Sequence, residues 1–308
     1  MPMQAAIVAE DIRKAYGPTQ AVDGVSLTVA RGEFFGILGP NGAGKTTTLE
    51  IVEGLRRPDS GRVEVLGQPP TPRTRGMLRR IGVQIQGLTF FERLTAREQI
   101  RTFAALYKLP ASRADEVLEM LGLTDKADTL TERLSGGQAQ RLSIGCAIVH
   151  APELLFLDEP TAGLDPQARR NLWDVLRGLN ERDGCTVVLT THYMDEAEEL
   201  CHRVAIMDTG RVLRADPPAT LIRDLGGVTR ISMPAAALAA EQARKLFPEA
   251  VVDAEEETPT TGTLTIRTTE PAAVLAELAA RDALRGLSVR GTTLEDVFLS
   301  LTGREYRA

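Results

Sequence analysis

The hydrophobic positions at the start of the chain follow the two-residue period of β-strands. Strands are predicted at 7–14, 25–29, 34–38 and 62–66. Gly17-Pro18 and Arg31-Gly32 separate the first three strands as turns. Residues 45–53 instead show a helical pattern, which Gly54 and Pro58 end. The chain is therefore predicted to open with strands, followed by a loop after residue 38 and a helix.

Further along the chain, helical and strand-like segments alternate. Residues 95–132 have a helical pattern that Pro110 and Gly122 divide. Beyond them, helices are predicted at 141–150, 171–182 and 195–200, and strands at 153–158 and 186–190. Strands that alternate with helices form a mainly parallel sheet joined by right-handed crossovers. The sequence therefore predicts an α/β fold.

A second unit begins near Leu225-Gly226-Gly227. Its predicted elements are strand 228–233, helix 235–247, strands 250–257 and 263–268, helix 271–281, strand 286–290 and helix 293–301. Without the last helix, this β-α-β-β-α-β order is typical of a small ferredoxin-like sandwich. We therefore expect two domains, one over residues 1–225 and an accessory α+β domain over residues 226–308.

The loop between the strand at 34–38 and the helix at 45–53 is a full match to GxxxxGK[ST]. Strand, loop and helix in this order form the context in which such a loop binds phosphates. Glycine tolerates the angles and the close approach that let backbone N–H groups converge on phosphate oxygens, and the helix adds the positive end of its dipole. Lys45 is expected on the β- and γ-phosphates, the Thr46 hydroxyl on Mg²⁺ and Thr47 on a further phosphate oxygen. ATP and Mg²⁺ are therefore the expected cofactors, and the expected binding residues are Gly39, Asn41, Gly42, Ala43, Gly44, Lys45, Thr46 and Thr47.

Two carboxylates follow the apolar strand Leu154-Leu155-Phe156-Leu157. The carboxyl end of a strand is where ligands bind in open α/β sheets. Asp158 is expected to hold Mg²⁺, and Glu159 to accept a proton from the attacking water. Acidic residues at strand ends are often only structural. The position of this pair, one domain length after the phosphate loop and directly before Pro160-Thr161, favours catalysis.

Residues 134–141, Leu-Ser-Gly-Gly-Gln-Ala-Gln-Arg, form a second glycine-rich motif. A serine cap followed by two glycines makes a helix start that can approach a γ-phosphate closely. Together with the phosphate loop, this motif resembles the ATP-binding cassette (ABC) family, over about residues 5–220. The resemblance implies a RecA-like, mainly parallel core, an antiparallel β subdomain, and a helical subdomain at about residues 87–150. In this family the second motif, here Ser135, Gly136, Gly137 and Gln138, closes over ATP held by the partner subunit, which implies a homodimer.

The same resemblance implies roles for four further side chains. They are Tyr16, stacking on adenine; Asp165, in a loop that crosses the dimer interface and orients the attacking water; His192, linking the γ-phosphate to the catalytic acid; and Gln86, sensing Mg²⁺ and the membrane partner. Gln84, two residues earlier on the same face of a strand, is a competing candidate for the last role.

Composition limits the function without defining it. No apolar run approaches the roughly 20 residues that a membrane-spanning helix needs, and residues 1–10 lack the pattern of a signal peptide. A net charge of −6 argues against nucleic acid as a partner. The cysteines and histidines form no recognised metal site. We therefore expect a cytoplasmic protein. The resemblance to the ABC family adds a separate integral-membrane permease as its partner, with the chain peripheral on the inner face of the cell membrane.

The predicted function is that of a transporter ATPase whose insertion at 87–132, which includes Arg93 and Arg97, docks on the permease. The segment 293–303 resembles the terminal helix of exporters of drugs, antibiotics, lipids or polysaccharides. Two alternatives stay open, a soluble cassette ATPase of repair or translation and the ATPase of an importer. Repair members carry long coiled coils between the two phosphate motifs, whereas fewer than 90 residues separate Thr46 from Leu134 here. Translation members usually carry two cassettes, and this chain has one.

Overall fold

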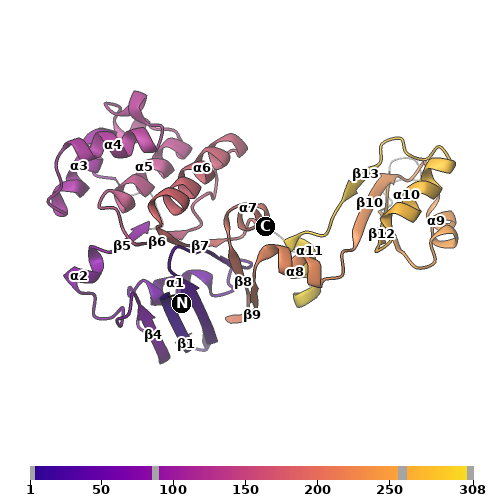
Figure 1. Cartoon of the computed structure of the whole chain (residues 1–308), viewed down its shortest axis with the longest axis horizontal. Helices are drawn as coiled ribbons and strands as arrows, with labels where there is room; N and C mark the ends of the chain where they lie inside the picture. The colour runs from indigo at the N-terminus through magenta and orange to yellow at the C-terminus, as the bar shows by residue number, and fades with distance from the viewer. Residues whose placement is uncertain (1–3, 85–89, 256–261, 304–308) are drawn as a thin grey trace. The chain divides into compact units, whose positions relative to one another are not determined.

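The structure is a computed structural model that describes residues 4–84, 90–255 and 262–303. The chain divides into two compact units, Met1–Pro218 and Ala219–Tyr306, which Figure 1 shows with the elements labelled. The division falls at the start of helix α8 (Pro218–Asp224), a few residues before the boundary that the sequence predicts.

A six-stranded sheet forms the centre of the first unit, in the order β5-β6-β7-β3-β8-β9. Its strands are β3 (Phe34–Leu38), β5 (Ile81–Gln84), β6 (Leu154–Asp158), β7 (Thr186–Thr191), β8 (Arg203–Asp208) and β9 (Arg211–Asp216). The neighbours from β5 to β8 are parallel, and β9 adds an antiparallel edge. Every residue of β3, β6 and β7 is buried, as expected for parallel strands covered on both faces. The predicted α/β core is confirmed.

A second, antiparallel sheet of the same unit has the order β2-β1-β4. Strands β1 (Ala5–Tyr16) and β2 (Thr19–Ala30) pair as a hairpin that is longer than the sequence pattern predicts, and β4 (Ser60–Val65) pairs with the other edge of β1. Helix α1 (Lys45–Val52) packs against strands of both sheets. This helix therefore carries the phosphate loop at the junction of the two sheets.

The remaining helices of the first unit follow the chain from β4 to β8. They are α2 (Arg75–Leu78), α3 (Ala96–Leu106), α4 (Ser112–Met120), α5 (Gly136–Ile148), α6 (Pro166–Asp183) and α7 (Met194–Leu200), with single 3₁₀ turns at Thr124–Lys126 and Thr131–Arg133. Helices α3, α4 and α5 gather at one end of the unit, away from β1 and β4 (Figure 1). Thr95 and Glu98 start α3 with a capping box, in which each side chain bonds the other's backbone N–H.

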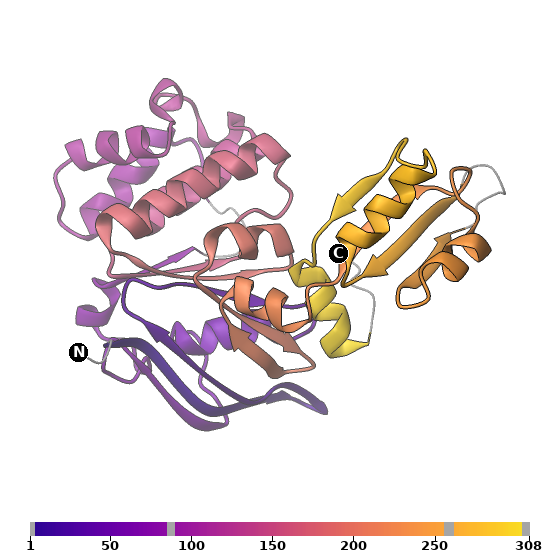
Figure 2. The same ribbon diagram turned by 45° about the vertical axis from the view of Figure 1, so that its right-hand side comes forward.

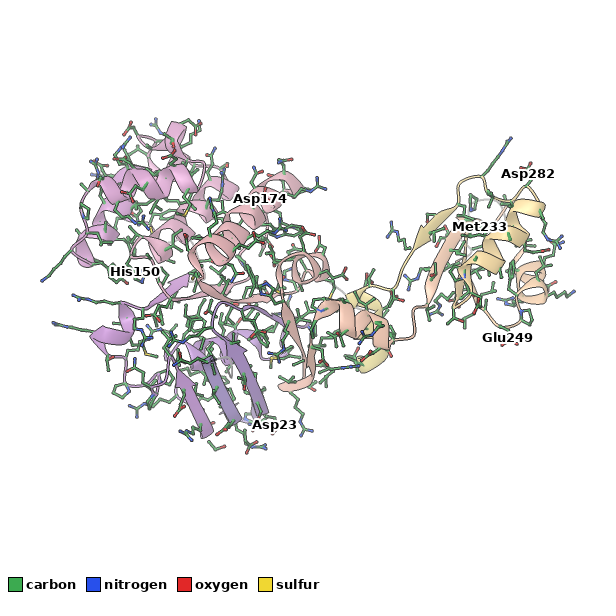
Figure 3. All side chains as sticks on the ribbon, in the orientation of Figure 1. Asp23, His150, Asp174, Met233, Glu249 and Asp282 are labelled. Atoms are coloured by element: carbon green, nitrogen blue, oxygen red, sulfur yellow. The ribbon has the colours of Figure 1, made fainter. Side chains whose placement is uncertain are left out.

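The second unit is a four-stranded antiparallel sheet in the order β11-β12-β10-β13. Its elements are β10 (Thr229–Pro234), α9 (Ala240–Leu246), β11 (Val251–Glu255), β12 (Thr263–Thr268), α10 (Pro271–Ala280), β13 (Ser288–Arg290) and α11 (Leu294–Thr302). Figure 2 shows α10 lying along this sheet, and Met233, labelled in Figure 3, belongs to the core between them. This strand order is that of the ferredoxin-like sandwich that the sequence predicts. The predicted helix at 235–247 begins only at Ala240.

Among the described residues, no helix has the length and apolar character needed to cross a membrane.

Candidate active site

The phosphate loop joins β3 to α1 in a fixed conformation. A Cβ on Gly39 would lie 2.3 Å from the Met207 carbonyl oxygen, and one on Gly44 would lie 2.3 Å from that of Ala21. Gly44 also has a φ of +94°, a left-handed angle that side chains rarely adopt. The loop therefore requires glycine at both positions, and it leads into the N-terminus of α1, where helices bind anions.

Lys45, Glu159 and His192 form a row of contacts at the end of this loop. The Lys45 side chain is only 4% exposed, and its Nζ lies 2.9 Å from the Gly39 carbonyl oxygen and 3.2 Å from Glu159 Oε1. The other oxygen of that carboxylate, Oε2, lies 3.1 Å from His192 Nδ1. The structure thus brings together three side chains that are far apart in the sequence, as the expected site requires.

Asp158 lies beside Thr46. The Thr46 hydroxyl is 3.2 Å from Asp158 Oδ1, and the Thr190 hydroxyl donates to the same oxygen. Burial raises the pKa of Asp158, while the two hydroxyl hydrogen bonds oppose this rise. Thr190 also accepts a hydrogen bond from the backbone N–H of Glu159 at 3.1 Å. Sequence analysis missed Thr190, because a threonine inside a β-branched strand gives no signal of a polar contact.

The backbone of Glu159 is in the left-handed region, with a φ of +47°. A residue other than glycine rarely adopts this angle without being held there by its surroundings. Its N–H donates both to the hydroxyl and to the carbonyl oxygen of Thr190, each at 3.1 Å. This turn places the Glu159 carboxylate between Lys45 and His192.

A cavity of about 590 Å³ connects the loop with Tyr16. It is lined by Tyr16, Thr19, Gln20, Ala21, Asn41, Gly42, Gly44, Lys45, Thr46, Thr47, Glu159 and Thr209. The Tyr16 side chain is 40% exposed, and the Arg56 guanidinium lies 5.1 Å from the centre of its ring. The volume suits a small ligand. Tyr16 and the phosphate loop therefore share one cavity, as the expected adenine contact requires.

The second glycine-rich motif and Asp165 do not line this cavity. Ser135 caps helix α5 and forms a capping box with Gln138. Asp165 caps helix α6, accepting hydrogen bonds from the N–H groups of Gln167 and Ala168. A Cβ on Gly137 would lie 2.8 Å from the Cβ of Ala168, so the two helix starts are neighbours. These residues form a second cluster, separate from the cavity of Lys45.

Gln86 lies outside the described residues. The competing candidate, Gln84, is buried at the end of β5, and its Oε1 has no hydrogen-bond partner within the described part of the chain.

Comparisons with known proteins agree with the expected family. The family model described as ABC transporter matches residues 22–162. Nod factor export ATP-binding protein I of Burkholderia thailandensis is 41% identical over 307 residues, which cover 98% of both chains. Linearmycin resistance ATP-binding protein LnrL of Bacillus subtilis is 38% identical over 313 residues, which cover 97% of this chain and 99% of the relative.

Solved structures match a smaller part of the chain. The dimeric structure of a post-hydrolysis state of the ATP-binding cassette MJ0796, bound to ADP and Pi, has a TM-score of 0.62 and 31% identity, and the match covers 68% of this chain and 98% of that one. For cbiO1 of Clostridium perfringens, part of the ABC transporter complex cbiONQ, the TM-score is 0.64 at 29% identity. This match covers 72% of our chain and 94% of cbiO1. The matches to the relatives, in contrast, extend over nearly the whole chain. The chain therefore belongs to the ABC transporter family, as an ATP-binding and ATP-hydrolysing subunit of its exporter branch.

Proposed function

We propose that ATP binds in the cavity between Tyr16 and the phosphate loop, with its adenine on the exposed Tyr16 ring. Thr46 and Asp158 are the proposed ligands of Mg²⁺, and Gln86 is a third. A hydroxyl and a carboxylate 3.2 Å apart fit this ion, because Mg²⁺ prefers hard oxygen ligands. When bound, Mg²⁺ would offset the negative charge of the phosphates. The buried Lys45 ammonium adds a second positive charge at the same end of the cavity.

Glu159 is the proposed general base of hydrolysis, and His192 orients it. The observation that carries this proposal is the Glu159 carboxylate, which lies between Lys45 Nζ at 3.2 Å and His192 Nδ1 at 3.1 Å. A carboxylate fixed at both oxygens can accept the proton of a water molecule that attacks the γ-phosphate. Replacing Glu159 with glutamine tests this role directly, because the amide keeps the shape of the side chain and cannot accept the proton.

The second cluster is the proposed contact with ATP held by another copy of the chain. Outside its chain neighbours and its own helix, no heavy atom of the described residues lies within 4 Å of the position that a Cβ on Gly136 would take, and Gly136 opens helix α5 directly after the Ser135 cap. A helix N-terminus in open space can receive a phosphate from a second molecule. In the proposed homodimer Ser135, Gly136, Gly137 and Gln138 cover the partner's ATP, while Asp165 lies at the interface and orients the attacking water.

A second cavity, of about 310 Å³, is the proposed docking site of the permease. It lies among helices α2, α3 and α5 and strand β5, and its lining includes Phe90, Phe103, Tyr107 and His150. His150 is labelled in Figure 3. The Tyr107 and His150 rings stack at 4.0 Å, and His150 Nδ1 is buried with no hydrogen-bond partner in the described residues. An apolar side chain of the permease would fit this lining.

Helix α3 offers a matched pair of variants to test the docking site. Phe103 lines the cavity, whereas Leu106, which is 73% exposed, does not. We expect Phe103→Asp to prevent co-purification of the permease from membranes and Leu106→Asp to preserve it. Equal recovery of the permease with both variants would refute the docking site. Nucleotide affinity and melting temperature, measured on the same samples, identify a variant that has simply misfolded.

Arg97, which the sequence analysis places on the docking insertion, is a poorer probe of this contact. Its guanidinium already binds Asp115 and, at 3.1 Å, Asp128 within the same unit. A charge reversal at Arg97 would break these internal contacts and would not report on the permease alone.

Export across the cell membrane is the proposed direction of transport, with the chain peripheral on the inner face. The names of the relatives support it, since one carries out Nod factor export and another confers linearmycin resistance. The proposed cargo is a drug, antibiotic, lipid or polysaccharide, bound by the permease. Identifying the permease that co-purifies with the chain, and measuring transport by the pair in vesicles, tests both direction and cargo. Uptake in place of export would contradict the proposal.

A further inference from the structure

Helices α6 and α7 are joined by a row of contacts next to the proposed catalytic residues. Arg169, Trp173 and Arg177 follow one another at intervals of four residues, so they lie on one face of α6. All three side chains contact α7 or Tyr193, the residue before it. The Arg169 guanidinium lies 3.9 Å from the centre of the Tyr193 ring and 3.4 Å from the Asp195 carboxylate. Trp173 Nε1 donates to Glu196 Oε1 at 3.1 Å, and Arg177 donates to Glu199 at 2.5 Å. The two helices are therefore connected over three successive turns of α6.

The middle contact of this row differs from the outer two in its burial. The side chains of Asp195 and Glu199 are 61% and 54% exposed, so their pairs with arginine contribute little. Glu196 is fully buried. A buried carboxyl group costs free energy unless hydrogen bonds satisfy it, and removing one of its partners is correspondingly costly. The Trp173–Glu196 hydrogen bond is therefore the energetically important contact of the row.

Glu196 also faces two hydroxyl groups next to the catalytic segments. Burial raises its pKa, and interactions with the Thr191, Thr161 and Trp173 side chains oppose this rise. Glu196 Oε2 and Thr161 Oγ1 are both buried and, among the described residues, lack a hydrogen-bond partner of good geometry. A carboxyl oxygen and a hydroxyl are complementary, so the two groups are suited to bond each other.

These contacts join three segments of the proposed site. Thr161 follows Glu159 by two residues, and Thr191 directly precedes His192. Trp173 belongs to the helix that Asp165 begins. We infer that Glu196 is a positioning residue, which holds the Glu159–His192 pair in a fixed relation to helix α6. Because α6 starts in the loop proposed to lie at the dimer interface, the Trp173–Glu196 contact links that interface to hydrolysis. The inference rests on the proposed roles of Glu159 and His192.

Conservative variants of the full-length chain test the inference. Trp173→Phe removes only the N–H donor and part of the ring system, and it should lower kcat by about tenfold while KM for ATP stays within about twofold. Glu196→Gln keeps an acceptor for Trp173 and gains a donor for Thr161, so it should retain most of kcat. Arg177→Met removes the exposed outer contact and serves as the matched control with unchanged kcat. A merely structural role of Trp173 would lower the melting temperature while leaving the kcat of the folded protein unchanged.

A double-mutant cycle with His192→Ala decides whether Trp173 and Glu196 act through His192. We expect Trp173→Phe to have no further effect on kcat in the His192→Ala background. The same tenfold loss in both backgrounds would overturn the inference. If Trp173→Phe has a normal kcat while His192→Ala has a low one, the inference is overturned and the proposed function stands. A normal kcat for His192→Ala would overturn the proposed role of His192, and the inference with it.

Discussion

Two helices of the first unit begin with glycine-rich motifs, and their surroundings differ. At α1, Lys45 is buried against Glu159 and Thr46 bonds Asp158, so the chain itself supplies charged and hydroxyl groups around the helix start. At α5, Ser135 and Gln138 satisfy each other in a capping box, and Gly136 faces open space. Both helix starts present N–H groups that suit an anion. We infer that the first is a complete phosphate site and that the second is half of a site, which a second copy of the chain completes.

The difference lies in what surrounds each motif. The first helix starts at the centre of a parallel sheet, where the ends of β6 and β7 bring in Asp158, Glu159 and Thr190. The second starts beside Asp165, whose carboxylate is already used to cap α6. The two glycine-rich helix starts therefore serve different purposes, and variants that act on only one of them can test the distinction.

The largest effect is expected at the complete site. Glu159→Gln should lower the rate of ATP hydrolysis by roughly 10²–10⁴-fold, the usual range for losing a general base, while ATP binding is kept. Phosphate release and nucleotide affinity, measured on the same preparation, check both parts. Glu153→Gln, which alters an exposed carboxylate paired with Arg80, is the matched control and should hydrolyse ATP normally. Near-normal turnover by Glu159→Gln would remove this residue from the mechanism.

Loss of the buried ammonium should weaken binding at the same site. Lys45→Ala removes a charge-assisted contact to the phosphates, so we expect roughly 10- to 100-fold weaker ATP binding. Titration with a fluorescent ATP analogue measures this change. Lys14→Ala is the control, because Lys14 pairs with Asp59 and does not line the cavity. The affinity of this variant for ATP should be unchanged. Unaltered affinity in Lys45→Ala would argue against the assignment of the cavity to the triphosphate.

Much of this comparison could be predicted from the sequence, because it depends on local patterns. The phosphate loop, the acidic pair after β6 and the capped helix at Ser135 each lie within a few consecutive residues. The hydrogen bonds that Thr190 donates to Asp158 and accepts from the Glu159 N–H could not be predicted, since they depend on strand register. Nor could the contact between Trp173 and Glu196, which joins two helices across a loop and a strand. The pattern located helix α9 but placed its start too early, because a turn closed by the Ala237 N–H on the Pro234 carbonyl oxygen follows β10 first.

Dimer formation tests the half-site at α5. Glu159→Gln with Mg²⁺ and ATP should elute as a dimer in size-exclusion chromatography, whereas ADP, which lacks the γ-phosphate, should give mostly monomer. Adding Gly136→Asp should prevent the dimer, because a carboxylate at that helix start repels the partner's phosphate. Gly136→Ala enters the same open space without charge and should weaken the dimer far less than Gly136→Asp does. Affinity for ATP should stay normal in both variants, since Gly136 does not line the cavity of Lys45.

The second unit is a separate possible source of dimers. Removing residues 228–308 from Glu159→Gln should leave ATP-dependent dimerisation intact if the half-site at Ser135 is the clamp. A truncated chain that remains monomeric at saturating ATP would contradict the shared site. If only the full-length chain dimerises, and does so regardless of nucleotide, the contact belongs to the second unit.

The last effect, on stability and not on activity, is expected at the opposite end of α1. This helix ends at Glu53, a carboxyl group that is only 3% exposed, although a negative charge at a helix C-terminus is unfavourable. Burial raises the pKa of Glu53 to about 8, against an ordinary value of 4.5. Between pH 4.5 and about pH 8, the folded chain therefore keeps a proton on Glu53 that the unfolded chain has lost. Folding stability consequently falls as the pH rises from about 4.5 to about 8.

Glu53→Gln removes this titration while keeping the shape of the side chain. The shift in pKa sets an upper limit of about 5 kcal/mol on the pH-dependent loss, and relaxation around the charge reduces it. We expect the variant to melt at a higher temperature than the parent at pH 8.5, with the difference shrinking towards pH 5. Glu64→Gln, at a partly exposed carboxylate in β4, is the control and should follow the parent at every pH. Parallel melting curves for Glu53→Gln and the parent across this range would mean that Glu53 does not bind its proton more tightly in the folded chain.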